Sequence, residues 1–525
     1  MDKPQARTAG SQSSSPTFPQ EIFDQIIDWV AIAQDTIPTL KTCTLVCQAW
    51  LDYGRTHLFR EMKFPLEFPK TGTEYISSHI RSPIVREQWK ERVAVERSVR
   101  ALKNLVMMMD SAMSESKTSL KPWSLYTRRL TISGYFPSTL LIENEMLNLL
   151  SLTFTSLEFL EIRHTNTTPK PMAERPLAGT DSDNTNTSAN VNANATKSTV
   201  SLFYGLLERN SSTLQSLVLQ DVIFASVFYL VECLSILMKV DNATLHSLSL
   251  REVIFDSTND GSTGTKLDGF LSNQSTFRRG NTTGLRTLNL DGASDEGSRR
   301  QRYTLLPAFF GHSKSLFDIS CLRNLSMHLS REDDITTLHD ILSYDHCQIT
   351  HVQLKFARIY AESGIAALQP NHIPAFSYLE SLTHLQIMFA GFYGDRDIQL
   401  LQSILQNLES LFTNLHFLSI AFTPTALTSP PWKIKMDVRR LFQKPDLKEL
   451  LSGVDSCLAR ALPVKTRKGP GLEKVEILLS RRFKPEVEDI ELVKGCLPKC
   501  SELQQLKVCF TEMVDSFWFQ VAAYQ

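Results

Sequence analysis

One short apolar pattern, Leu-x-x-Leu-x-Leu, recurs along most of this chain and constrains its fold more than any other feature. Ile, Val or Met replaces Leu in some copies. Seven of the nine intervals between copies are 27 to 40 residues long, which is enough for one strand and one helix in each unit. The ten copies begin at Leu157, Leu214, Leu245, Leu285, Leu322, Ile349, Leu382, Leu415, Leu472 and Leu503.

Segments with helical spacing of apolar residues lie between several of these copies. A unit of one strand and one helix leaves one side apolar, and only a neighbouring unit can cover that side. The sequence therefore predicts an α/β fold, a curved strand–helix solenoid with a parallel sheet. The helices are expected at residues 201–210, 226–240, 334–346, 397–412 and 487–499.

The position between the last two apolar residues of each copy must point away from the core, because side chains alternate along a strand. Nine of these ten residues are polar, which predicts a sheet with one open face wide enough to meet a protein surface. The long loops at either end are the competing binding site. The candidate target-binding residues on this face are Arg251, Asn289, Asp291, His328, His351, Gln353, Lys355, His384, Gln386 and Phe417.

His351 and His384 occupy equivalent positions in successive repeats and could be neighbours. Such a pair could bind a metal or respond to pH, although two surface histidines more often have neither role. The pair Cys496-x3-Cys500 lacks the second ligand pair of a zinc site. No nucleophile elbow, nucleotide-binding loop or paired-carboxylate signature is present, so the sequence predicts no enzyme activity and no cofactor.

Charge and hydropathy exclude two classes of partner. The formal net charge is −1, which gives no electrostatic reason to expect nucleic acid or an anionic membrane. No stretch of about 18 apolar residues is present, so neither a signal peptide nor a membrane span is expected. Nine scattered cysteines without a CxxC pair are typical of a reducing, intracellular compartment.

Residues 18–59 form a separate helical segment with surplus apolar surface. Thr17 and Pro19 mark a helix start, and Ile22, Ile26 and Trp29 then follow on one helix face. About 40 residues cannot bury this much apolar surface alone, so a partner is expected. The alternative is a helical hairpin packed on the body of the protein.

This segment resembles an F-box. The resemblance is carried by Phe18-Pro19-x-Glu21-Ile22-x3-Ile26-Ile27, then Leu40-x2-Cys43-x-Leu45-Val46-Cys47-x2-Trp50, then Arg55-x2-Leu58-Phe59, with Phe18 where Leu is commoner. It implies three helices that dock on a Skp-type adaptor and so connect to a cullin and a RING subunit. The implied adaptor-binding residues are Phe18, Pro19, Ile22, Phe23, Ile26, Leu45, Val46, Cys47 and Trp50.

The repeats resemble leucine-rich repeats of the kind often fused to F-boxes. They are longer than the usual ~20–29 residues, and Val222, Val253, Ala293 and Ala357 replace the usual Asn or Cys, so the turns need other hydrogen-bond partners. Together the resemblances imply a substrate-recognition subunit of a Skp–cullin–F-box ubiquitin ligase, in the cytoplasm or nucleus, that binds a protein target. The alternative is a protein-interaction scaffold that does not direct degradation.

The expected domain organisation follows from these segments. A disordered N-terminus, residues 1–16, precedes the F-box at 17–62 and a linker at 63–122 that contains a connecting helix. The solenoid occupies 123–525 and starts with a degenerate copy near Leu130. Insertions are expected near 165–198, 254–283 and 423–470, the last folding over one edge of the solenoid.

Overall fold

A computed structural model of the chain describes residues 20–65, 126–133, 154–163, 204–255, 284–291, 317–357, 376–423, 445–461 and 472–511, with short gaps inside several ranges. The expected disordered N-terminus and the expected insertions near 165–198 and 254–283 lie almost entirely outside these residues. So does nearly all of the expected connecting helix at 91–113.

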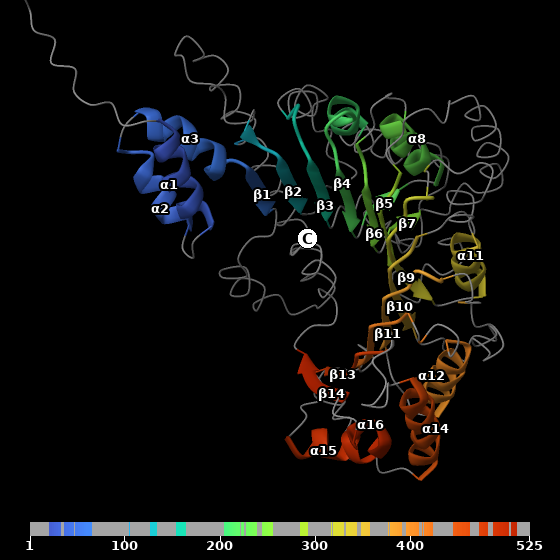
Figure 1. Ribbon diagram of the computed structural model, residues 1–525. Helices are drawn as coiled ribbons and strands as arrows, with labels where there is room; N and C mark the ends of the chain where they lie inside the picture. The colour runs from blue at the N-terminus through green and yellow to red at the C-terminus, as the bar shows by residue number, and fades with distance from the viewer. Residues whose placement is uncertain are drawn as a thin grey trace, which may run out of the picture.

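The described residues form one open 12-stranded parallel sheet. It curves from β1 at one end to β14 at the other (Figure 1). The α/β class and the parallel sheet predicted from the repeats are thereby confirmed. In spatial order the strands are β1 (Glu61–Pro65), β2 (Arg129–Ser133), β3 (Phe159–Arg163), β4 (Ser216–Gln220), β6 (Ser247–Arg251), β8 (Thr287–Asp291), β9 (Asn324–Leu329), β10 (His351–Ala357), β11 (His384–Ala390), β12 (Phe417–Thr423), β13 (Lys474–Ser480) and β14 (Leu506–Thr511).

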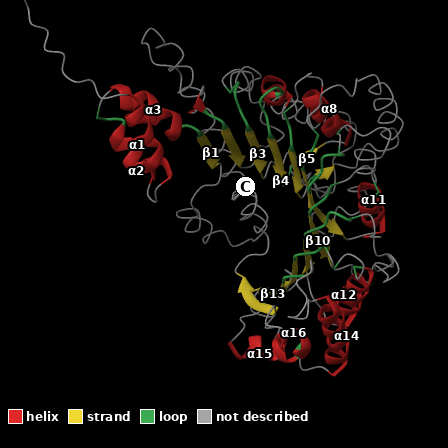
Figure 2. Ribbon diagram, in the orientation of Figure 1, coloured by secondary structure: helices red, strands yellow, loops and turns green. Residues whose placement is uncertain are grey.

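Helices follow many of the strands and lie along the outer side of the curved sheet (Figure 2). The first three helices, α1 (Gln20–Ile32), α2 (Thr36–Cys43) and α3 (Gln48–Leu58), stand apart at the β1 end (Figure 1). None of the described helices is long and apolar enough to cross a bilayer. The solenoid helices include a helix at residues 204–210, within the expected 201–210. The others named here are α8 (Val227–Met238), α11 (Glu332–Leu342), α12 (Asp395–Asn407), α14 (Pro445–Ala461), α15 (Val487–Gly495) and α16 (Pro498–Glu502).

The recurrent apolar residues build the core between the sheet and these helices. Leu217 pairs with Leu248 and Leu219 with Leu250, and each is at most 5% exposed. The same phase continues through Val508 on the last strand, so the apolar pairs of the copies join one core cluster. Each unit therefore buries its neighbour's apolar side, which is how a repeat array gains its stability.

Threonine hydroxyl groups tie successive repeats together just before their strands begin. Thr213 donates to the Leu157 carbonyl at 2.9 Å, and Thr383 donates to the Thr350 carbonyl at 3.0 Å. Buried Asn210 adds three bonds, to Leu157 N, Phe154 O and Leu206 O, each at 2.8 Å. The backbone groups at these strand starts thus find their partners in side chains that the sequence pattern did not single out.

Four described elements, in three places, differ from expectation. Residues 61–65 form the edge strand β1, where Pro65 is tolerated because, among the described strands, only β2 pairs with β1. Strands β5 (Ile223–Phe224) and β7 (Ile254–Phe255) form a second, two-stranded sheet. The described part of the 423–470 segment is α14, which packs beside α12 instead of folding over an edge.

Candidate functional site

The three-helix unit exposes much of its apolar surface. Its own core is small and consists of Ile27, Leu40 and Cys43, which are 0%, 2% and 8% exposed. The remaining large apolar side chains leave exposed surface on the order of several hundred Å², which is unusual for a surface without a partner. The exposed residues are Ile22 (40%), Ile26 (39%), Trp29 (77%), Ile37 (61%), Leu45 (85%) and Val46 (62%).

Close packing of the α2–α3 turn against α3 places Leu45 and Val46 outward. A Cβ atom at buried Gly54 would lie 2.8 Å from the Thr44 Cγ2 atom, so the missing side chain of Gly54 leaves room for Thr44 of the turn. The backbone N–H of Leu45 bonds to Thr42 O at 3.0 Å and that of Val46 to Cys43 O at 3.1 Å. With its backbone held in this way, the turn directs both side chains away from the unit's core.

Polar contacts hold α1 and α3 in one arrangement. The Asp28 carboxylate accepts a hydrogen bond from the Tyr53 hydroxyl at 3.1 Å and lies 3.0 Å from His57 Nε2. The Tyr53 and His57 rings meet edge to face, with centroids 5.3 Å apart. The exposed apolar surface of this unit is therefore presented on fixed helices, which favours docking with little ordering cost.

The structure divides the predicted adaptor-binding residues into three groups. Ile22, Ile26, Leu45 and Val46 are exposed, as docking requires. Phe23 and Trp50 are half-buried and pack edge to face, with centroids 5.7 Å apart. Phe18, Pro19 and Cys47 lie outside the described residues. Trp29 and Ile37 were not among the predicted set, although the position of Trp29 on the Ile22–Ile26 stripe was a signal that could have identified it.

The inner face of the curved sheet, opposite the helices, carries three rows of side chains that the strand register aligns. The first row is Phe159, Ser216, Ser247, Thr287, Asn324, His351, His384, Phe417 and Lys474. The central row is Glu161, Val218, Ser249, Asn289, Ser326, Gln353, Gln386, Ser419, Glu476 and Lys507. The third row is Arg163, Gln220, Arg251, Asp291, His328, Lys355, Met388, Ala421, Leu478 and Cys509.

The central row differs from the expected open face, because most of its side chains are buried. Asn289, Gln353 and Gln386, all predicted to bind the target, are 8%, 6% and 5% exposed. They lie on the predicted side of the sheet, but neighbouring strands about 4.8 Å apart bring their side chains into contact. Ser326 donates to Gln353 Oε1 at 2.8 Å, and Gln353 Nε2 donates to Gln386 Oε1 at 3.1 Å. These two bonds tie β9, β10 and β11 together across the inner face.

The first row contains a stack of rings that remains partly exposed. His351 and His384 lie face to face with centroids 4.3 Å apart, and Phe417 follows at 5.8 Å from His384. Lys474 Nζ lies 5.1 Å from the centre of the Phe417 ring. Burial and the neighbouring His384 lower the pKa of His351 to about 4, and burial also lowers the pKa of His384. At neutral pH the stack is uncharged, with a cation at one end.

The third row holds a charged cluster that joins three strands. Asp291 Oδ1 lies 3.1 Å from His328 Nδ1, and Lys355 Nζ lies 3.4 Å from both Asp291 carboxylate oxygens. Burial alone would raise the pKa of Asp291, but the His328 hydrogen bond and the Lys355 charge outweigh it and lower the pKa to about 2. His328 is 3% exposed, whereas Asp291, Lys355 and Arg251 are half-buried. The partly exposed members offer mixed charge to a binding partner.

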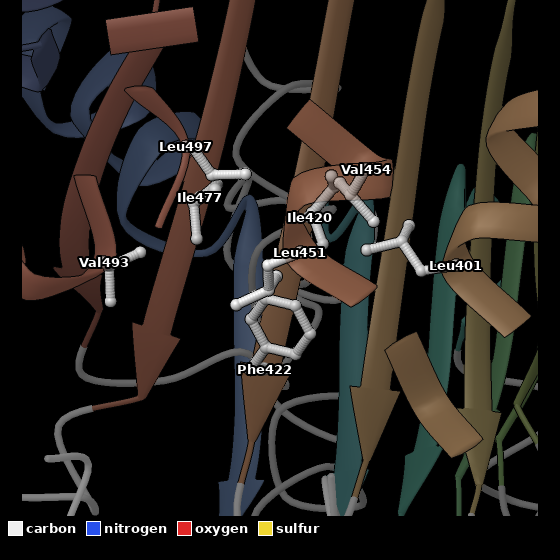
Figure 3. A pocket seen from close by; sticks show the side chains of 8 residues that line it. All are labelled: Leu401, Ile420, Phe422, Leu451, Val454, Ile477, Val493 and Leu497. Atoms are coloured by element: carbon white, nitrogen blue, oxygen red, sulfur yellow. The ribbon is translucent and has the colours of Figure 1, made fainter. Parts of the chain in front are cut away.

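One small enclosed cavity lies in the core of the last repeats. Its volume is about 10 Å³, which is room for about one water, and it lies between β12, β13, α12, α14 and α15. Its lining is entirely apolar (Figure 3): Leu401, Ile420, Phe422, Leu451, Val454, Ile477, Val493 and Leu497. Across the part of the chain that the structure describes, no three potential metal ligands come together.

Comparison with known proteins gives no further identification. No protein-family model matches the chain, and no curated protein matches it. The candidate functional surfaces are therefore defined by geometry and chemistry alone: an exposed apolar three-helix unit and a partly exposed inner sheet face.

Proposed function

We propose that this chain is the substrate-recognition subunit of a Skp–cullin–F-box type E3 ubiquitin ligase. In this role the three-helix unit docks on a Skp-type adaptor, and the solenoid binds a target protein. The chain forms no bonds itself. Catalysis arises from proximity, because the assembly holds a lysine of the target near a ubiquitin thioester on another subunit.

The observation that carries the proposal is the exposed apolar surface of α1, α2 and the following turn. Trp29 and Leu45 are 77% and 85% exposed, although burial of such side chains is worth about 2 kcal/mol each. A hairpin packed on the body of the protein would have hidden them. Among the described elements, the solenoid lies on the other side of β1, so the adaptor-docking surface and the target-binding surface are well separated (Figure 1).

The partly exposed residues of the inner face support target binding. The ring stack of His351, His384 and Phe417 offers flat apolar contact, and Asp291 and Lys355 offer charge of both signs. A 12-stranded sheet spans roughly 50 Å at about 4.8 Å per strand, a width suited to a protein partner. Buried Asn289, Gln353, Gln386 and His328 contribute as structural support for these neighbours.

A test separates a receptor from a scaffold that does not direct degradation. Partners captured by proximity labelling are followed in cells that express the full chain or a variant with Leu45 and Val46 replaced by Asp. A receptor predicts longer lifetimes of captured partners with the variant, matched by proteasome inhibition of the wild type. Equal lifetimes with both chains would favour the scaffold, the second candidate function.

A further inference from the structure

The stacked pair of His351 and His384 presents two hydrogen-bond acceptors in the same direction. Thr350 donates its hydroxyl hydrogen to the Arg323 carbonyl at 3.3 Å, and Thr383 donates its own to the Thr350 carbonyl. Neither hydroxyl can therefore donate to the imidazole that it contacts, so each ring donates from Nδ1 and each Nε2 keeps its lone pair. Because the rings are oriented alike and lie within 11° of parallel, their Nε2 atoms point the same way.

Both acceptor atoms are available to a ligand. Each of the two rings is half-buried, and no described residue donates a hydrogen bond to the Nε2 atom of either His351 or His384. Burial lowers the pKa of both rings, so at neutral pH they accept hydrogen bonds and carry no charge. The pair is thus an uncharged acceptor site that remains open on the inner face of the sheet.

The separation of the two rings identifies the kind of group that the pair can bind. The ring centroids are 4.3 Å apart, and in parallel rings the two Nε2 atoms are separated by about the same distance. A tetrahedral ammonium nitrogen that donates to two acceptors at about 2.9 Å holds them about 4.7 Å apart. A zinc ion at about 2.1 Å from each nitrogen holds two imidazole ligands about 3.4 Å apart. The spacing therefore fits one amine nitrogen better than a shared metal ion, and no third potential metal ligand joins the pair among the described residues.

A neighbouring carboxylate favours a cation at this position. Burial and His416 lower the pKa of His384, whereas the Glu473 carboxylate raises it, so Glu473 acts on positive charge at this ring. The Glu473 side chain is 72% exposed and lies 3.2 Å from His416. The exposed cations on either side of the stack, Arg323 and Lys474, are not among the main causes of the pKa shift of either ring.

We propose that His351 and His384 form a binding site, the imidazole site, for the ammonium group of a lysine side chain in the target protein. The ammonium donates one hydrogen bond to each Nε2, and the methylene groups of the same side chain lie against the Phe417 ring, whose centroid is 5.8 Å from that of His384. The lysine that receives ubiquitin is then a different one. Only the source of the amine, a target protein, rests on the proposed function, because binding itself needs no other subunit.

The test is a titration of the full chain, labelled with nitrogen-15 at its histidines, with butylammonium at neutral pH. Side-chain NMR follows the Nε2 signals, which the variants His351→Phe and His384→Phe assign. Butylammonium should shift both signals in a saturable way, with a dissociation constant on the order of 1 to 10 mM. The matched ligand butyltrimethylammonium has the same charge and stem but no N–H, so it should bind at least about tenfold more weakly.

The two histidine variants should also weaken butylammonium binding at least about tenfold, since phenylalanine keeps a flat ring but offers no acceptor. The matched control is His339→Phe, which replaces an exposed histidine on α11 and should leave the titration unchanged. Equal binding of the two ammonium ions, or binding of neither, would overturn the proposal. Binding of Zn²⁺ through both rings without binding of butylammonium would make the pair a metal site instead. The two ammonium ions are compared on the wild-type chain, so this result holds even if a variant does not fold.

Separate substitutions distinguish the imidazole site from the adaptor-docking surface. Replacement of Leu45 and Val46 by Asp, which should prevent adaptor docking, should leave both the butylammonium titration and the capture of partners unchanged. A chain with both His351→Phe and His384→Phe should lose captured partners and keep adaptor binding. Acetylation of a captured partner's lysines, which removes their charge, should prevent its binding to the purified full chain. Capture that persists with the double histidine variant would overturn the role of the imidazole site in target binding.

Discussion

The Nδ1 atom of His384 lies 2.9 Å from the hydroxyl oxygen of Thr383, whose single hydrogen is donated to the Thr350 carbonyl. The imidazole must therefore donate from Nδ1, which leaves Nε2 as an acceptor. His351 repeats the arrangement with Thr350 at 2.8 Å. Both stacked rings are thus neutral. Each is oriented by the threonine that precedes it in its repeat, and each keeps Nε2 as a hydrogen-bond acceptor.

Acid should destabilise this stack. The folded-state pKa of His351 is about 4, below the usual 6.5, so the unfolded chain binds the proton first as pH falls. The stability that depends on neutral His351 is complete above pH 6.5 and is lost between 6.5 and 4, by about 1 kcal/mol for a partly exposed ring. Urea unfolding at both pH values measures it. His351→Phe should have a smaller pH dependence over this range, and an unchanged dependence would contradict the assignment.

Removing the charge of Asp291 on the inner face should lower the free energy of unfolding of the protein. Asp291→Asn leaves Lys355 and His328 without their carboxylate partner, at a cost of about 1 to 3 kcal/mol in the free energy of unfolding. Chemical denaturation measures the loss. The control is Asp340→Asn on α11, where the carboxylate is more exposed and lies 4.0 Å from His339; we expect a change within about 0.5 kcal/mol there. Equal effects of the two substitutions would refute the role of the cluster.

Asp455 should be essential for the packing of the last repeats. Its carboxylate on α14 is 1% exposed and accepts the backbone N–H groups of Lys499 and Cys500 at 3.1 and 3.0 Å, which caps α16. Asp455→Ala leaves two donors unsatisfied and should cost about 2 kcal/mol. Ser452→Ala, on an exposed site of the same helix, is the control. Thermal unfolding of the two variants should differ clearly, and similar midpoints would count against this cap.

In the three-helix unit, substitution of a buried residue should lower the stability of the protein, whereas substitution of an exposed apolar residue should leave it unchanged. Ile27→Ala removes a fully buried side chain and should destabilise the protein by about 2 to 4 kcal/mol. Leu45→Ser changes a side chain that is 85% exposed, so the stability of the free chain should stay within about 0.5 kcal/mol. Calorimetry of both variants measures this contrast. A large loss with Leu45→Ser would mean that the residue packs within its own chain.

The sheet was predictable because one pattern repeats in one phase. Each copy of Leu-x-x-Leu-x-Leu specifies a strand and the side that faces the helices, and Leu217, Leu248 and Leu288 stand in one register as expected. The edge strand β1 was missed because Pro65 and the absence of the pattern conceal it. The ties made by Thr213, Thr383 and Asn210 were also missed, because their value depends on which carbonyl the fold brings near.

The candidate surfaces were predicted less completely. Side-chain alternation placed Gln353 and Gln386 on the inner face, but periodicity contains no information on lateral crowding, which buries them. The stacking of His351 and His384 followed from their equivalent repeat positions. The exposure of Trp29 could be inferred from its helical stripe, whereas that of Ile37 depends on how α2 sits against α1.

The most direct measurement is a calorimetric titration of a purified Skp-type adaptor into the full chain. We predict saturable binding with one adaptor for each chain, lost when exposed Leu45 and Val46 are both replaced by Asp and retained with the exposed-surface control Lys41→Ala. Circular dichroism of the three chains should be the same. No binding by the wild type, or equal binding by all three chains, would contradict adaptor docking through this surface.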